Sequence, residues 1–192
     1  MLSAYTIKLM PELQPKSQCI LFDWGDTLMR DFREFSGPMS MWPRVEALPY
    51  VSEALAELHP RWILALATNA VDSNEKDIAQ ALQRADLVRF IDRIYCYRGI
   101  GHKKPTPQYF NHVLSDLQLD RDQVVMVGDD FASDIAGANQ SGIRAIWFCE
   151  QSDEQSIEQS CVQTIEQPID NNYRIIRNFR ELPSTVETFM AR

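Results

Sequence analysis

The sequence predicts an α/β fold in three layers, with helices on both faces of a doubly wound, mainly parallel sheet. Short apolar runs alternate with segments of helical periodicity along most of the chain, which is the pattern of repeated β-α units. The apolar runs lack regularly alternating polar positions, as expected for strands that are buried on both faces. Apolar residues make up 45% of the 192 residues, which is enough for one ordinary globular core.

Six strands are expected in this sheet, because six short runs are rich in apolar and β-branched residues. The run from Cys19 to Phe22 ends at Asp23, and the run from Val124 to Val127 ends at Gly128. The predicted strands span residues 18–22, 62–67, 93–96, 124–127, 143–148 and 173–176.

Helices are expected between the strands, each with one apolar face toward the sheet. Residues 49–58 and the stretch after Pro107 both carry apolar residues at i, i+3, i+4 and i+7, the spacing of a one-sided helix. These two faces consist of Val51, Ala54, Leu55 and Leu58, and of Phe110, Val113, Leu114 and Leu117.

Two further helices are predicted from their capping residues. Asp72 or Ser73 is expected to cap a helix that runs to about Ala85. Ser133 is expected to cap another helix, which ends near Gly142.

Two segments are expected to lie apart from these elements. Residues 1–17 contain two prolines and are predicted to form an irregular N-terminal arm. Residues 150–172 are rich in Gln, Ser, Glu and Asp, and are predicted to form a solvated, partly helical excursion before the last strand, with no site in it. The whole chain, residues 1–192, is then expected to be a single domain.

Composition restricts the partners and the compartment. The net charge of −8 argues against nucleic acid as an electrostatic partner, because binding to a phosphate backbone requires clustered Lys and Arg. The four cysteines include no C-x-x-C pair, which suits a reducing cytosol. No apolar run approaches the roughly 18 residues of a membrane span, and the N-terminus lacks a signal-peptide pattern. A cytoplasmic protein without a membrane partner is expected.

Polar residues follow three of the predicted strands. Asp23 opens the string Asp23-Trp24-Gly25-Asp26-Thr27, Thr68-Asn69 closes the second strand, and Gly128-Asp129 closes the fourth. Open α/β sheets bind their ligands at this carboxyl edge. Taken alone, the first string is equally compatible with an ordinary turn that is capped by an Asp or a hydroxyl side chain.

Together with a basic loop that contains Lys104, these segments resemble, in order, the four motifs of the haloacid dehalogenase superfamily, whose members are mostly phosphohydrolases. The resemblance covers about residues 19–148 and implies a Rossmann-like core. It also implies Mg²⁺ as the cofactor and a phosphorylated compound as the substrate. The anchor residues of the four motifs are Asp23, Thr68, Lys104, and Asp129 with Asp134.

The resemblance assigns a role to each anchor. Asp23 would be the nucleophile that forms an aspartyl-phosphate, and Lys104 would place its ammonium between this carboxylate and the phosphate. The Thr68 hydroxyl and the backbone N–H of Asn69 would bind phosphate oxygens. The spacing of two prolines favours Lys104 over the adjacent Lys103, which stays open.

The metal ligands that the resemblance implies are all oxygen atoms, which Mg²⁺ prefers. Asp23, Asp129 and the backbone carbonyl of Gly25 would bind the ion, and Asp134 would hold one of its waters. A turn residue and an ordinary helix-start Asp are the alternative interpretation of Asp129 and Asp134.

Gly25 departs from the family pattern. The family has its acid/base Asp two residues after the nucleophile, and here that position is Gly25, whereas Asp26 stands where a Gly is usual. Two functions follow from this. Either the chain is a phosphomonoesterase in which Asp26 serves as the catalytic acid, or it is a degenerate member that binds metal and phosphate with little or no turnover.

No large cap domain is expected over the site. Asp23 and Thr68 are too close in sequence for a helical-bundle cap, and the stretch from Thr68 to Lys104 holds one helix and one strand. Capless members tend toward bulky substrates or use a neighbouring subunit as a lid, so a homo-oligomer stays open by analogy.

The loop at residues 31–48 has two interpretations. Its arginines would meet an anionic substrate, or its aromatic residues would tuck a surface loop onto the core. Two other chemistries of the superfamily fit less well. Phosphonoacetaldehyde hydrolases need a cap-borne Lys, and residues 29–67 contain no Lys. Dehalogenases lack the metal motif that is present at residues 128–134.

Overall fold

The computed structural model describes residues 16–150 and 172–191. Most of the predicted N-terminal arm and of the polar excursion therefore lies outside the described residues, and the extent of the domain over 1–192 stays a prediction. Among the described residues, no helix has the length and apolar character needed to cross a membrane.

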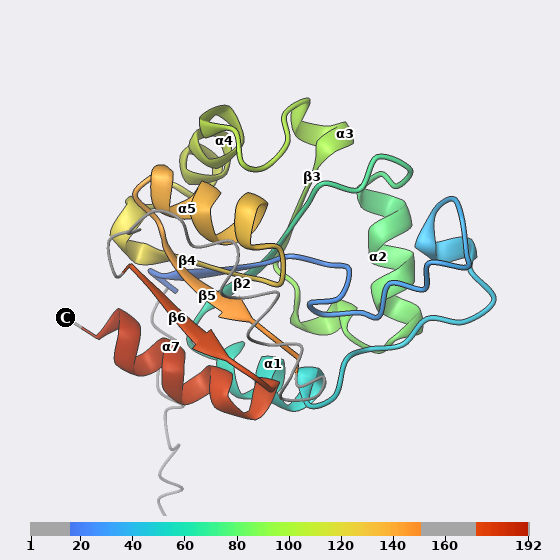
Figure 1. Ribbon diagram of the computed structural model, residues 1–192, viewed down its shortest axis with the longest axis horizontal. Coiled ribbons are helices and arrows are strands. Elements are labelled where there is room, and N and C mark those ends of the chain that lie inside the picture. The colour runs from blue at the N-terminus through green and yellow to red at the C-terminus, as the bar shows by residue number, and fades with distance from the viewer. Residues whose placement is uncertain (1–15, 151–171, 192) are drawn as a thin grey trace, which may run out of the picture.

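The core of the molecule is a six-stranded sheet in the order β3-β2-β1-β4-β5-β6, in which every pairing is parallel (Figure 1). This confirms the predicted fold class. Each predicted strand is also confirmed to within one residue at either end. The strands are β1 Cys19–Phe22, β2 Ile63–Thr68, β3 Arg93–Cys96, β4 Val124–Gly128, β5 Arg144–Phe148 and β6 Tyr173–Ile176.

Helices cover both faces of the sheet and complete the three layers (Figure 1). One apolar cluster joins the sheet to α1, α2 and α7, and a second joins its other face to α4 and α5. Successive residues of β1 enter opposite clusters, Ile20 and Phe22 the first, Cys19 and Leu21 the second, because strand side chains alternate between faces. The helices are α1 Val51–Leu58, α2 Glu75–Arg84, α3 Tyr97–Ile100, α4 Pro107–Leu117, α5 Gly137–Gln140 and α7 Leu182–Met190.

Shorter turns of helix join these elements. A π-helix, Phe131–Ala136, leads directly into α5. The 3₁₀ turns are Met39–Met41, Val88–Phe90, Arg121–Gln123 and Phe179–Glu181. The segment between β1 and α1 contains only the first of these turns, so the described chain has no large cap domain, as predicted.

The predicted helix faces are confirmed, but both predicted caps are wrong. Helix α2 is capped by Asn74, whose side chain accepts the N–H groups of Lys76 and Asp77. The Asp77 carboxylate accepts the Asn74 N–H in return, and this reciprocal pair fixes the helix start beyond Asp72 and Ser73.

The helical segment after β4 is capped by Asp130, which accepts the N–H groups of Ala132 and Ser133. It begins at Phe131, earlier than expected, so Ser133 already lies inside its first turn. The predicted end near Gly142 is right: α5 ends at Gln140, and Gly142 has a φ of 75°.

The register of the central strands decides where the site lies. Phe22 pairs with Leu66 of β2 and with Val127 of β4. The Asp23 N–H continues the ladder and donates to the Val127 carbonyl at 2.9 Å. The residues that follow β1, β2 and β4 therefore meet at one edge of the sheet.

Candidate active site

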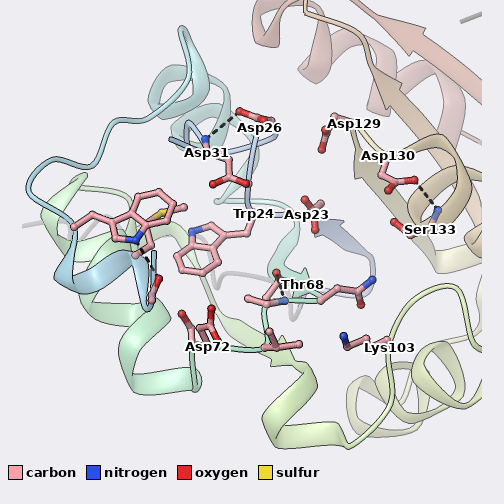
Figure 2. Close-up of a pocket in the computed structure, with 18 residues that line it drawn as sticks. Asp23, Trp24, Asp26, Asp31, Thr68, Asp72, Lys103, Asp129, Asp130 and Ser133 are labelled. Carbon is pink, nitrogen blue, oxygen red and sulfur yellow. Dashed lines mark hydrogen bonds between the residues drawn. The ribbon is translucent and has the colours of Figure 1, made fainter. Parts of the chain in front are cut away.

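A pocket of about 530 Å³ opens at the carboxyl ends of β1, β2 and β4 (Figure 2). The loops after these strands form its floor, and the segment before α1 forms one wall. Its lining includes Asp23, Gly25, Asp26, Asp31, Thr68, Asn69, Lys103 and Asp129.

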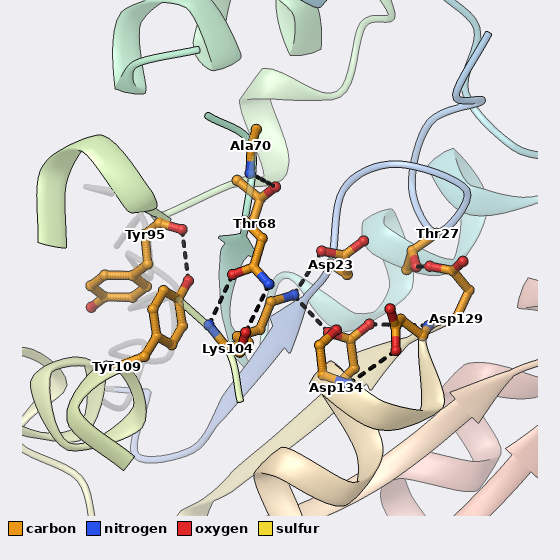
Figure 3. Close-up of polar contacts among 12 residues, drawn as sticks. Asp23, Thr27, Thr68, Ala70, Tyr95, Lys104, Tyr109, Asp129 and Asp134 are labelled. Atoms are coloured by element: carbon orange, nitrogen blue, oxygen red, sulfur yellow. Dashed lines mark hydrogen bonds and ion pairs between the residues drawn. The ribbon is translucent and has the colours of Figure 1, made fainter. Parts of the chain in front are cut away.

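Lys104 lies beneath this pocket and joins two of the predicted site residues (Figure 3). Its Nζ lies 2.7 Å from Asp23 Oδ1 and 2.7 Å from Asp134 Oδ1, and its side chain is 1% exposed. Burial alone would lower the pKa of Lys104, but the two carboxylates outweigh it and the pKa is raised. The ammonium is therefore retained in the interior.

The backbone of Lys104 is fixed by the side chain of Asn69. The Lys104 N–H donates to Asn69 Oδ1 at 2.8 Å, and Asn69 Nδ2 donates to the Lys104 carbonyl at 2.9 Å. Lys103, the alternative site lysine, places its Nζ 4.9 Å from the centre of the Tyr97 ring. The geometry therefore brings Lys104, rather than its neighbour, to Asp23.

Three carboxylates cluster at the site, and two of them, Asp23 and Asp134, contact Lys104. Oxygens of Asp23, Asp129 and Asp134 lie within 4.8 Å of one another. Burial raises the pKa of all three, to about 6 for Asp129 and for Asp134, while the ammonium of Lys104 opposes the shift at Asp23 and Asp134. One ammonium balances only part of this negative charge.

The cluster has the composition of a divalent-cation site. Mg²⁺ prefers hard oxygen ligands and is usually bound through one or two carboxylates and several waters. Three carboxylates beside a single ammonium leave an excess of negative charge that such an ion would offset. The residues present therefore fit Mg²⁺.

Asp129 and Asp134 are held in place by different means. Asp129 accepts the Thr27 hydroxyl at 2.8 Å, and its carbonyl accepts Trp147 Nε1 at 2.9 Å. Asp134 lies fully buried in the π-helix and accepts the Ser133 hydroxyl at 3.0 Å. Its carboxylate packs against Gly128, where an added Cβ would lie only 2.1 Å from Asp134 Oδ2.

Thr68 lies at the end of β2 and lines the pocket. Its Oγ1 accepts the Ala70 N–H at 3.1 Å (Figure 3). A hydroxyl that accepts one bond still has its proton to donate, so this contact leaves Thr68 able to donate toward the pocket.

The loop after Asp23 turns sharply at Asp26, which has a φ of 50°. The Asp26 carboxylate accepts the backbone N–H of Asp31 at 3.0 Å (Figure 2). An added Cβ at Gly25 would lie 3.5 Å from Asp31 Cβ and 3.7 Å from its Oδ2. Burial raises the pKa of Asp31, and the nearby Asp26 carboxylate raises it further. The positive charge of Arg33 lowers this pKa but does not cancel the increase.

The wall of the pocket comes from the 31–48 loop through Gly37, Met39 and Trp42. Aromatic contacts tuck this loop onto the core: Phe35 meets Phe32 edge to face and Trp42 at a tilt, with ring centroids 5.8 and 5.7 Å apart. Arg44 lies 4.0 Å over the Phe32 ring rather than in the pocket. The aromatic interpretation of this loop thus describes its packing, and two of its apolar residues also face the pocket.

Sequence reasoning missed three groups that the fold brings to the site: the Asn69 carboxamide, the Thr27 hydroxyl and the Asp31 carboxylate. For Asn69, the sequence motif predicts a role only for the backbone N–H. Thr27 belongs to the first motif and is fully buried, so a polar residue at a buried motif position was a usable signal. Nothing local in the sequence distinguishes Asp31 from the other acidic residues of its loop.

Comparisons with known proteins agree with this architecture. A ribulose-1,5-bisphosphate 5-phosphatase from Halopiger xanaduensis is 27% identical over 138 residues, which are 71% of this chain and 56% of that protein. A phosphoserine phosphatase from Thermus thermophilus is 31% identical over 105 residues, 54% of this chain and 41% of that protein. The chain spans about half the length of these relatives.

A solved structure of an uncharacterized protein from Listeria monocytogenes serotype 4b shares the fold over nearly its whole length. Its TM-score is 0.77 at 24% identity, with 90% of this chain and 98% of that chain covered. A model of the haloacid dehalogenase-like hydrolase family also matches residues 8–148, which is most of the sequence. This chain therefore belongs to the haloacid dehalogenase-like hydrolase family.

Proposed function

We propose that the protein is a Mg²⁺-dependent phosphomonoesterase that acts through an aspartyl-phosphate on Asp23. The observation that carries this proposal is the ammonium of Lys104, buried between Asp23 and Asp134, with Asp23 lining an open pocket. The two phosphatases that the chain resembles are both named for phosphate esters.

The chemistry assigns two transfers to Asp23. Its carboxylate oxygen attacks the phosphorus of the ester while the bond to the leaving oxygen breaks. Water then attacks the same phosphorus, the bond to Asp23 breaks, and inorganic phosphate is released. Such covalent catalysis by a carboxylate splits one difficult displacement into two easier ones.

Other residues stabilise the charge that this transfer spreads over the phosphoryl oxygens. Lys104 holds the Asp23 carboxylate in one orientation and supplies a positive charge beside the attacking oxygen. The Thr68 hydroxyl and the Asn69 N–H donate to phosphate oxygens. Phosphate monoesters thus match the pocket, although the alcohol that they carry is left open.

Asp23, Asp129 and the Gly25 carbonyl would hold Mg²⁺, and Asp134 would contact it through a water. When bound, the ion would neutralise negative charge on the phosphate as it is transferred. Asp23 and Asp129 line the pocket, whereas Asp134 is fully buried and does not line it, which supports the more distant position for its carboxylate.

Phosphate release from p-nitrophenyl phosphate tests the proposal, because an aryl leaving group needs little protonation. Wild-type protein is expected to release phosphate with Mg²⁺ and to stop on addition of EDTA. Asp23→Asn is expected to abolish release, because an amide is a poor nucleophile. Asp86→Asn makes the same change at an exposed carboxylate paired with Arg89 and serves as the control. An Asp23→Asn protein with wild-type turnover would contradict the covalent mechanism.

Gly25 favours a second candidate, a member that binds metal and phosphate without turnover. Loss of a general acid costs about 10²–10⁴-fold in rate. This candidate predicts Mg²⁺-dependent binding of inorganic phosphate, measured by calorimetry, with no release from aryl or alkyl esters. Release from aryl esters alone would instead indicate a working nucleophile with a weak acid.

A further inference from the structure

We propose that Asp31 supplies the proton to the leaving-group oxygen, from the space beside Gly25. The inference rests on the proposed function, since a leaving group exists only if Asp23 attacks a phosphate ester. It assigns the acid to a residue that stands well beyond the first motif in the sequence and enters the site through the fold of the loop.

The position of the Asp31 side chain is the first observation. A Cβ built on Gly25 would lie 3.5 Å from Asp31 Cβ and 3.7 Å from both its Cγ and its Oδ2. The carboxylate of Asp31 therefore lies beside the space that a side chain at position 25 would fill. Figure 2 shows it pointing into the pocket, on the side of Trp24 and Asp23.

The second observation is that the other carboxylates of the pocket have other partners or other places. Asp26 accepts the N–H of Asp31, and Asp130 caps the π-helix. Asp129 accepts the Thr27 hydroxyl and belongs to the proposed metal cluster. Asp72 lies on the β2 side of the pocket, beyond Thr68 (Figure 2).

Asp31, by contrast, has no hydrogen bond or ion pair from its carboxylate to any residue that the structure describes. Its side chain is exposed at the mouth of the pocket, where the alcohol part of a phosphate ester would leave. A free carboxyl group in this place can both give and take a proton.

The loop is built so as to hold Asp31 there. The Asp26 N–H donates to the Met29 carbonyl at 2.7 Å, and the Asp26 carboxylate accepts the Asp31 N–H at 3.0 Å. The Arg30 N–H donates to the Glu46 carbonyl at 2.9 Å, which ties the residue just before Asp31 to the far end of the 31–48 loop. Asp26 is thus a positioning residue, and the Asp31 side chain lies beside the space that Gly25 leaves open.

The proton transfers balance over the two steps. In the first step, the Asp31 carboxyl gives its proton to the ester oxygen as the bond from that oxygen to phosphorus breaks, and the alcohol leaves. In the second step, the Asp31 carboxylate takes a proton from the water whose oxygen attacks the phosphorus. Asp31 returns to the acid form as phosphate is released from Asp23.

Asp31→Asn tests the inference, because an amide occupies the same space but cannot act as the acid. The kcat/KM for an alkyl ester, β-glycerophosphate, is expected to fall by about 10²-fold or more, whereas that for p-nitrophenyl phosphate changes little. Retained hydrolysis of the aryl ester also shows that the variant is folded. The matched control is Glu34→Gln, on the same loop but outside the pocket, where Glu34 lies 3.8 Å from Arg44.

A double variant moves the carboxylate back to position 25. In Gly25→Asp/Asp31→Ala, the new Cβ meets the Cβ of residue 31 at an ordinary contact distance of 3.5 Å, and Gly25 does not require a positive φ. The kcat/KM of this variant for the alkyl ester is expected to be at least about tenfold higher than that of Asp31→Ala.

Several outcomes would overturn the inference. An unchanged alkyl-to-aryl ratio in Asp31→Asn excludes Asp31 as the acid, although the Asp23 mechanism stands if Asp23→Asn is inactive on the aryl ester. If Asp26→Asn lowers the ratio instead, the proton comes from Asp26. A wild-type protein that hydrolyses neither ester contradicts the proposed function and this inference with it.

Discussion

Asn69 positions the Lys104 ammonium indirectly, because its side chain bonds to the main chain of Lys104 and not to the ammonium. Its carboxamide both accepts from and donates to the main chain of Lys104. Asn69→Ala leaves these two groups without partners in a partly buried place, which is expected to cost about 1–3 kcal/mol. The kcat for p-nitrophenyl phosphate should fall as well, because the ammonium is no longer fixed beside Asp23. Thermal unfolding and steady-state kinetics measure the two effects.

The graded control for this prediction is Asn69→Asp. Its carboxylate still accepts the Lys104 N–H but no longer donates to the carbonyl, so it should lie between wild type and Asn69→Ala. Both variants keep the backbone N–H of residue 69, which separates the clamp from the proposed contact of that N–H with phosphate. An Asn69→Ala protein with normal stability and normal kcat would show that Lys104 is fixed by its carboxylate partners alone.

Asp129 and Asp134 are expected to differ in how strongly each affects metal affinity. Asp129 lies at the end of β4 beside Asp23, whereas Asp134 is already bonded to Lys104 and Ser133. Mg²⁺ affinity should therefore fall more in Asp129→Asn than in Asp134→Asn. In Asp134→Asn the affinity should fall by about 10–100-fold, as is usual for a residue that acts on the metal through a ligand or a water. Isothermal titration with Mg²⁺ compares them, and the opposite order would reverse the two assignments.

At the scale of elements, the end of β4 can pack against the π-helix only because residue 128 is a glycine. An added Cβ at Gly128 would lie 2.1 Å from Asp134 Oδ2 and 2.7 Å from Asp134 Cβ. Either the strand or the helix must shift to admit it. Gly128→Ala is therefore expected to destabilise the fold by about 1–3 kcal/mol, as overpacking in a core does, and to displace Asp134 from Lys104.

The control for this change is Gly99→Ala, because an added Cβ there meets only Cys96 Sγ, at 3.7 Å. Chemical denaturation of the two variants gives the difference in the free energy of unfolding. Equal stability of Gly128→Ala and Gly99→Ala would show that β4 and the π-helix can separate at little cost.

At the scale of the whole molecule, the proposed metal site joins the segments after β1 and β4 that the fold brings together. A ligand that binds only the folded state stabilises it by mass action, by about 2.7 kcal/mol at 100 times its Kd. Mg²⁺ is therefore expected to raise the Tm of the wild-type protein without any substrate, and Asp129→Asn should lose most of this gain. Asp86→Asn should retain it, and a Tm that does not respond to Mg²⁺ would argue against a resident ion.

The layers, the strand positions and the residues at the carboxyl edge of the sheet could be predicted from the sequence alone. Periodicity records which side of a segment is buried, so β1 to β6 and the apolar faces of α1 and α4 could be placed from it. The strand-end residues Asp23, Thr68 and Asp129 followed, since the carboxyl ends of parallel strands share one edge of a sheet.

Which side chains meet at that edge depends on the tertiary structure. Asn69 and Lys104 are 35 residues apart, and the choice of Lys104 over Lys103 depends on how the loop before α4 is bonded to Asn69, just after β2. Asp31 comes to Gly25 through a turn that Asp26 closes with a side-chain contact. These contacts depend on the directions of individual side chains between segments, which the pattern of apolar residues along a chain does not record.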